Sequence, residues 1–139
     1  INGIIAADEA RHANAYSAFV KRIFELDPSQ MMTAFEDMMR RKIVMPAHFM
    51  RQSGDKVGEL WSHFSDAAQR TKVYTAQDYI DILSSLISDW DIEHMSDLNE
   101  AGEKARDYLM RLPSRLQRVT DRMAEPEKEY EFKWIGQIT

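Results

Sequence analysis

A helical repeat of apolar residues near the start of the chain limits the fold more than any other feature of the sequence. At a turn of ~100° per residue, every member of this stripe lies within roughly 40° of Ile5 on a helical wheel. The members are Ile5, Glu9, His12, Tyr16, Phe19 and Ile23. The stripe predicts an amphipathic helix that carries a carboxylate and an imidazole on its apolar side.

Glu9 and His12 are unusual members of an apolar stripe. An ionised carboxylate in apolar surroundings is costly unless a partner compensates its charge. A metal ion is such a partner, because carboxylate oxygen and neutral imidazole nitrogen both bind metals. Diiron helical bundles use this Glu-x-x-His spacing on one helix face. We therefore expect both side chains to face inward as metal ligands; the alternative is a core histidine hydrogen-bonded to a neighbouring acid.

Composition narrows the classes of protein and of metal site. The 139 residues suit one domain, and the chain contains no cysteine, which excludes disulfides, thiolate ligands and cysteine nucleophiles. A net charge of −5 argues against nucleic acid as a partner. No apolar run approaches the ~18–20 residues that span a membrane. We expect a soluble protein whose metal site uses oxygen and nitrogen ligands.

The apolar pattern is helical almost throughout. We expect the first helix from about Ile4 to Glu25, where Asp27 and Pro28 end it and begin the next helix. A third helix is expected around Leu60 to Ala68, after a polar loop.

Capping residues mark the two remaining helices. Thr75 with Asp78 three residues later resembles a capping box, and Asn99 is expected to cap the last long helix. Apolar and charged residues alternate from 130 to 138, which predicts a short strand or an extended tail.

Five segments, taken together and in order, resemble one known family. They are IAADEARHANAY, FEDMMRRKIVMPAHFM, HFSDAAQR, VYTAQDYIDIL and KARDYLMRLPSRL. They are similar to the C-terminal part of soluble acyl-acyl-carrier-protein desaturases, the plant stearoyl-type enzymes and their bacterial relatives. The resemblance implies an all-α fold: a ferritin-like helical bundle fragment with one diiron-bundle helix, the C-terminal helices and a short extended tail. Residues 1–139 would be the C-terminal part of a single domain whose N-terminal part is absent.

The resemblance also implies roles for three residues of the first helix. Glu9 and His12 resemble one of the two Glu-x-x-His pairs that hold the family's two irons, and are the expected catalytic metal ligands. Asp8 matches an acid beside the ligands that is expected to orient a histidine; the alternative is a solvent-facing acid. The second pair and both single glutamates are absent, so the chain alone is expected to be inactive.

The activity implied by the resemblance is that of an oxidoreductase in fatty acid biosynthesis. It places a cis double bond in a saturated acyl chain attached to acyl carrier protein, using a diiron centre, O2 and electrons from ferredoxin. The family further implies a homodimer in the bacterial cytoplasm or the plastid stroma. Two alternatives stay open: a metal-free helical structural or interaction module with the same fold, and a ferritin-like iron store.

Two other groups of residues match family features. Met45, Pro46 and Trp61 match positions that line the deep part of the acyl tunnel, although methionine and tryptophan at helical spacing also suit an ordinary core. The basic run at residues 40–42 could face an acidic carrier protein. Cations at a helix C-terminus, favoured by the helix dipole, are the alternative explanation for that run.

Overall fold

The computed structural model describes residues 1–41, 49, 56 and 59–123, and these residues contain helices and no strand. The helices are α1 (Asn2–Leu26), α2 (Pro28–Arg40), α3 (Glu59–Arg70), α4 (Ala76–Asp89) and α5 (Glu100–Thr120). The predicted all-α class is confirmed. The extended tail predicted at 130–138 lies outside the described residues. No described helix is both long enough and apolar enough to cross a membrane.

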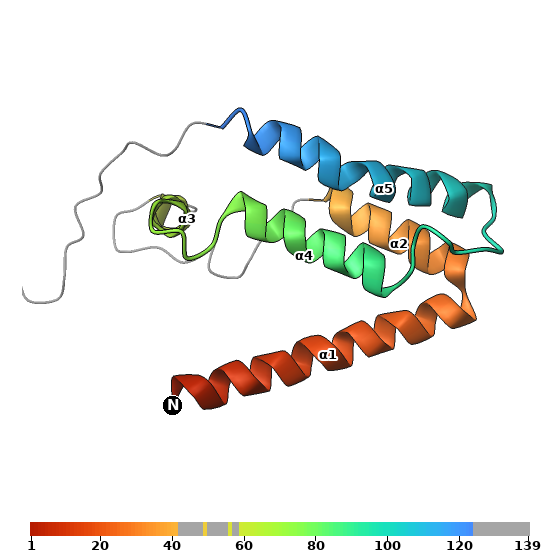
Figure 1. The fold of residues 1–139 in the computed structure, drawn as a ribbon, viewed down its shortest axis with the longest axis horizontal. Coiled ribbons are helices and arrows are strands. Elements are labelled where there is room, and N and C mark those ends of the chain that lie inside the picture. Colours follow the sequence, from red (N-terminus) through yellow and green to blue (C-terminus); the bar gives the residue numbers. More distant parts are fainter. Residues whose placement is uncertain (42–48, 50–55, 57–58, 124–139) are drawn as a thin grey trace, which may run out of the picture.

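Helices α2, α4 and α5 form the packed part of the structure. Helix α5 contacts both α2 and α4, and α1 contacts α2 after a sharp turn between them (Figure 1). The first half of α1 extends away from these contacts, and every residue from 1 to 16 is exposed. Helix α1 is therefore attached to the other helices through its second half.

The turn between α1 and α2 follows from Asp27 and Pro28, as the sequence predicted. The Gln30 backbone N–H donates a hydrogen bond to Asp27 Oδ1 at 3.0 Å, which satisfies one of the free donors at the start of α2. Pro28 occupies the first turn, where its missing N–H has no consequence.

The predicted caps of α4 and α5 are also confirmed. The Thr75 backbone N–H donates to Asp78 Oδ2 at 2.7 Å, and the Asp78 backbone N–H donates back to Thr75 Oγ1 at 3.3 Å. This reciprocal pair is a capping box. At the start of α5, the Gly102 N–H donates to Asn99 Oδ1 at 2.9 Å.

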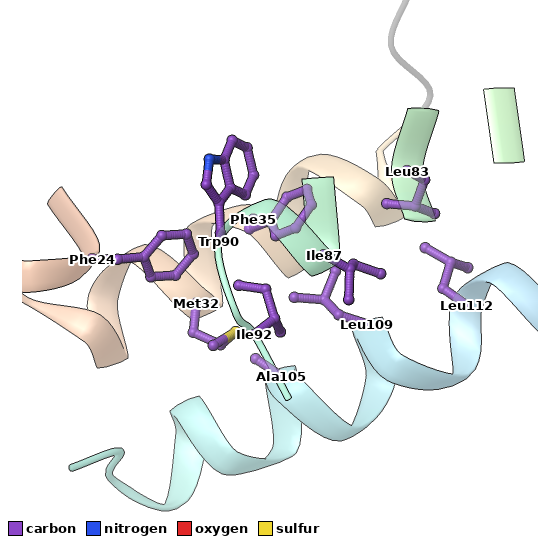
Figure 2. Close-up of a cluster of buried hydrophobic side chains, with 10 residues drawn as sticks. All are labelled: Phe24, Met32, Phe35, Leu83, Ile87, Trp90, Ile92, Ala105, Leu109 and Leu112. Carbon is purple, nitrogen blue, oxygen red and sulfur yellow. The ribbon is translucent and has the colours of Figure 1, made fainter. Parts of the chain in front are cut away.

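The core lies between α2, α4, α5 and the second half of α1 (Figure 2). Met32, Ile92 and Leu109 are its largest fully buried side chains. The remaining members of the cluster are Phe24, Phe35, Leu83, Ile87, Trp90, Ala105 and Leu112. Burial of apolar surface at this junction is the main force that holds the four segments together.

A glycine allows the close approach of α5 to α2. A Cβ atom added at Gly102 would lie 3.2 Å from the Ser29 Cα atom and 3.2 Å from Leu98 Cδ2. Ser29 is also tied to this end of α5, because its Oγ accepts the Asn99 backbone N–H at 2.8 Å. A backbone atom cannot move aside as easily as the end of a flexible side chain, so a Cβ atom here would have to push Ser29 away by a few tenths of an ångström.

We expect Gly102→Ala to lower the free energy of unfolding by about 1–3 kcal/mol, because the added methyl group overpacks the contact with Ser29. Gly3→Ala is the matched control, since an added Cβ there meets nothing within 4 Å. The control should gain up to about 1 kcal/mol from helix propensity. Urea unfolding monitored by circular dichroism measures both changes, and equal effects of the two substitutions would contradict the close-approach explanation.

Candidate functional site

Glu9 and His12 lie one turn apart in the first half of α1. The His12 Nδ1 atom is 3.6 Å from Glu9 Oε2, so the two side chains converge on one side of the helix. This convergence follows from their i, i+3 spacing, which places both side chains on one helix face. The prediction that the Glu9 carboxylate and the His12 imidazole lie together on one helix face is confirmed.

The expectation that this pair faces inward is wrong for the part of the chain that the structure describes. The His12 side chain is 62% exposed and the Glu9 side chain is 73% exposed. The apolar residues of the same stripe are exposed as well, namely Ile5, Tyr16, Phe19 and Ile23. The whole side of α1 that carries the pair is therefore open.

The side of α1 that does pack is a different one. Ser17 and Val20 are half-buried and Phe24 is buried, and on the helical wheel these three lie roughly 60–120° from Ile5. The pair thus points about a quarter turn away from the contact with the other helices. Helix α1 therefore has one side that packs on the described core and a different, exposed side that carries Glu9 and His12.

Asp8 forms an ion pair with Arg11, one turn further along α1. Its side chain is 52% exposed, so this pair is solvated. The predicted role of Asp8 in orienting a histidine stays a prediction.

The donor set on α1 suits a metal ion such as iron but is too small to hold one alone. A carboxylate oxygen and an imidazole nitrogen are suitable ligands for iron, and both side chains reach the same space. Within residues 1–41, 49, 56 and 59–123, no group of three or more His, Asp or Glu side chains is arranged to hold a metal ion. Other ligands are needed for a complete site.

The predicted tunnel residues fall at the edge of what the structure describes. Met45 and Pro46 lie outside the described residues. Trp61 lies in the first turn of α3, where the described features cover the backbone and not this side chain. All three assignments stay predictions.

Arg40 and Arg41, at the end of α2, form contacts with other residues of the chain. The Arg40 Nη2 atom lies 2.6 Å from Glu36 Oε1, and the Arg40 guanidinium lies 3.9 Å from the centre of the Tyr108 ring in α5. Arg41 pairs with Asp37 at 2.6 Å, and Lys42 lies outside the described residues. The Arg40 and Arg41 side chains are still 56% and 75% exposed, so carrier docking and the helix-dipole explanation both stay predictions.

Sequence reasoning missed a contact that attaches α1 to the end of α4. The Trp90 Nε1–H donates to the Ser17 hydroxyl oxygen at 3.0 Å and to the Ser17 carbonyl oxygen at 3.2 Å. The Trp90 ring also packs on Phe24 and Phe35, with centroid distances of 5.9 and 5.3 Å (Figure 2). A buried indole requires a hydrogen-bond acceptor, and that requirement was the signal available in the sequence.

A tight helix end sets the position of Trp90. The Ile92 N–H donates to the Ile87 carbonyl at 3.0 Å and the Asp91 N–H donates to the Ser88 carbonyl at 3.0 Å, which is a Schellman motif. Asp91 occupies its left-handed position with φ 50°, where glycine is the common residue and aspartate is tolerated.

His94 supports this turn from the next residues of the chain. Its Nδ1 atom lies 2.6 Å from Asp91 Oδ1. The hydrogen bond to Asp91 raises the pKa of His94 above its usual value, and the negative charges of Asp91 and Glu93 act in the same direction. The pair is exposed, and its hydrogen bond joins two residues of the turn that follows α4.

Comparison with known proteins adds to this geometry. Residues 1–136 match the family model described as fatty acid desaturase. The chain is 47% identical over 139 residues to stearoyl-[acyl-carrier-protein] 9-desaturase 1, chloroplastic, of Arabidopsis thaliana, and 46% identical over 138 residues to the corresponding 9-desaturase of Spinacia oleracea. The Ricinus communis enzyme of the same name is 47% identical. These matches cover 97% of the chain, which spans about a third of each relative's length.

The His94–Asp91 pair predicts a dependence of stability on pH. Because the pKa of His94 is raised in the folded protein, its contribution to stability is fully present below the unfolded-state pKa of about 6.5 and is lost as pH rises through the folded pKa. We expect the free energy of unfolding to fall between about pH 6 and pH 8 by more in the unsubstituted protein than in His94→Gln. Urea unfolding at several pH values measures this, and parallel pH profiles would refute it.

Proposed function

We propose, because this chain belongs to the fatty acid desaturase family, that it is part of an acyl-carrier-protein desaturase and supplies half of that enzyme's diiron site. The observation that carries the proposal is the convergence of Glu9 and His12 on the open side of α1. The relatives' names state a stearoyl-carrier-protein substrate and a chloroplast location for those proteins. For this chain, the acyl carrier protein as partner and a plastid compartment are parts of the proposal.

The exposed apolar stripe of α1 supports the proposal that other helices cover this side of α1 in the whole protein. Ile5 is 53% exposed, Tyr16 67% and Phe19 62%, on the same side as the pair. Apolar side chains gathered on one side of a helix gain stability when another element covers them. Since the chain spans about a third of its relatives' length, we infer that other bundle helices of the whole protein cover this stripe and bring the remaining ligands.

Each proposed ligand has a defined task. Glu9 would hold iron through its carboxylate, and His12 through an imidazole nitrogen. Asp8 would orient a histidine once the neighbouring helices are in place. When bound, the two irons would use O2 and ferredoxin electrons to remove two hydrogens from neighbouring methylene groups, which no side chain can do by acid–base chemistry.

The rest of the proposal concerns the acyl chain and the assembly. Met45, Pro46 and Trp61 would line the deep part of an apolar tunnel that sets which carbons face the metal centre. A homodimer is proposed by family analogy. The competing function is a metal-free helical module, and it requires non-ligating residues at the other ligand positions of the whole protein.

We expect His12→Ala, in the full-length enzyme, to reduce bound iron and to lower desaturation. The loss of activity should exceed the about 10–100-fold that follows when a residue hydrogen-bonded to a metal ligand is removed. Helicity should stay nearly unchanged because alanine is a good helix former and the residues by which α1 packs on the described core, from Ser17 to Phe24, are untouched. Iron analysis, circular dichroism and product analysis measure these effects. His94→Ala is the matched control and should keep iron and activity; unchanged iron in His12→Ala would rule out the ligand role.

We expect Trp61→Ala to let a longer acyl chain bind or to move the double bond, because removal of the indole lengthens the proposed tunnel. Trp61→Phe retains most of the volume and serves as the control. Gas chromatography of the product fatty acids after incubation with carrier-bound chains of several lengths measures the change. An identical product distribution in Trp61→Ala would remove this residue from the tunnel.

A further inference from the structure

We propose that Trp90 is a positioning residue for the metal ligands on α1: its indole fixes the rotation of this helix about its own axis and so sets the direction of Glu9 and His12. The inference rests on the proposed function, because it assigns a role relative to the iron site. It is carried by the contact of Trp90 with Ser17 and by the continuity of α1 from that contact to the ligands.

The contact acts on one side of α1 only. The Nε1–H donates to both oxygens of Ser17, at 3.0 and 3.2 Å, and the ring packs on Phe24 nearly two turns further along. Ser17 and Phe24 both lie roughly 100–120° from Ile5 on the helical wheel. A directional hydrogen bond and a ring contact on the same side resist rotation, whereas apolar burial alone is not directional.

Rotation at Ser17 is transmitted to the ligands. Helix α1 is continuous from Asn2 to Leu26. At a rise of ~1.5 Å per residue, His12 lies about 7.5 Å and Glu9 about 12 Å from Ser17 along the axis. A side-chain atom about 6 Å from the axis moves by ~1 Å when the helix rotates by ~10°. Metal and catalytic sites require their groups within ~0.5 Å, so a small rotation disturbs both ligands together.

Trp90 is itself held firmly enough for this task. Its ring lies against Phe35 of α2 at a centroid distance of 5.3 Å, and its side chain is buried. The Schellman motif at residues 87–92 fixes its backbone at the end of α4. The indole therefore relates α1 to both α2 and α4.

The test is Trp90→Phe in the full-length enzyme, which removes the N–H donor and retains an aromatic ring for Phe24 and Phe35. We expect iron to transfer to an added chelator about tenfold faster than from the unsubstituted enzyme and the visible absorption of the iron site to shift. Ile92→Val is the matched control, because Ile92 is fully buried in the same core cluster and its side chain has no group that could hydrogen-bond to α1 (Figure 2). It should lower the thermal midpoint and leave the iron release rate and the spectrum unchanged.

Ser17→Ala separates the hydrogen bond from the bulk of the ring. It should speed iron release by less than Trp90→Phe does, because the Ser17 carbonyl still accepts the indole N–H. The double variant should release iron no faster than Trp90→Phe alone. Additive effects of the two substitutions on the release rate would overturn the proposal. So would equal iron release rates in Trp90→Phe and Ile92→Val, each measured at the same number of degrees below its own thermal midpoint.

The same measurements separate this inference from the proposed function. If the unsubstituted enzyme binds iron and His12→Ala loses it, the diiron proposal holds, and Trp90→Phe alone decides the positioning role. If the unsubstituted full-length enzyme binds no iron, the proposed function fails and the positioning role fails with it.

Discussion

The packing of Trp90 between Phe24 and Phe35 joins three helices at one point. Phe24 belongs to α1, Phe35 to α2, and Trp90 ends α4, with ring centroids 5.9 and 5.3 Å from that of the indole. Edge-to-face and tilted contacts of this kind contribute about 0.5–1.5 kcal/mol each beyond the burial of their area. The direction in which α1 leaves the core depends on this junction, since no residue of its first sixteen is buried.

Because the apolar stripe of α1 is exposed, the Glu9 carboxylate can lie on it and remain in contact with solvent. In the described chain Glu9 is solvated, so its charge costs little. Once other helices cover Ile5, Tyr16 and Phe19, the gain from apolar burial would be opposed by the desolvation of the carboxylate. In the proposed enzyme, metal binding would offset that cost and would link assembly of the bundle to formation of the proposed iron site.

Local rules predicted most of the fold. Asp27, Thr75 and Asn99 cap their helices as expected, because a cap depends on residues three positions apart. The spacing of Glu9 and His12 is equally local. The packed side of α1 could not be predicted, because the wheel gives an apolar direction and not the element that covers it. The Trp90–Ser17 hydrogen bond joins residues 73 positions apart, which no periodicity reveals.

Stability and the proposed chemistry are located in different parts of the chain. The large, fully buried side chains Met32, Ile92 and Leu109 lie where α2, α5 and the α4–α5 connection meet, whereas the proposed ligands lie on the distant half of α1. Ligand substitutions should therefore leave the core intact, and core substitutions should act on the ligands only through the orientation of α1. Trp90 is the residue that belongs to both parts, because it is buried in the core and donates its hydrogen bond to α1.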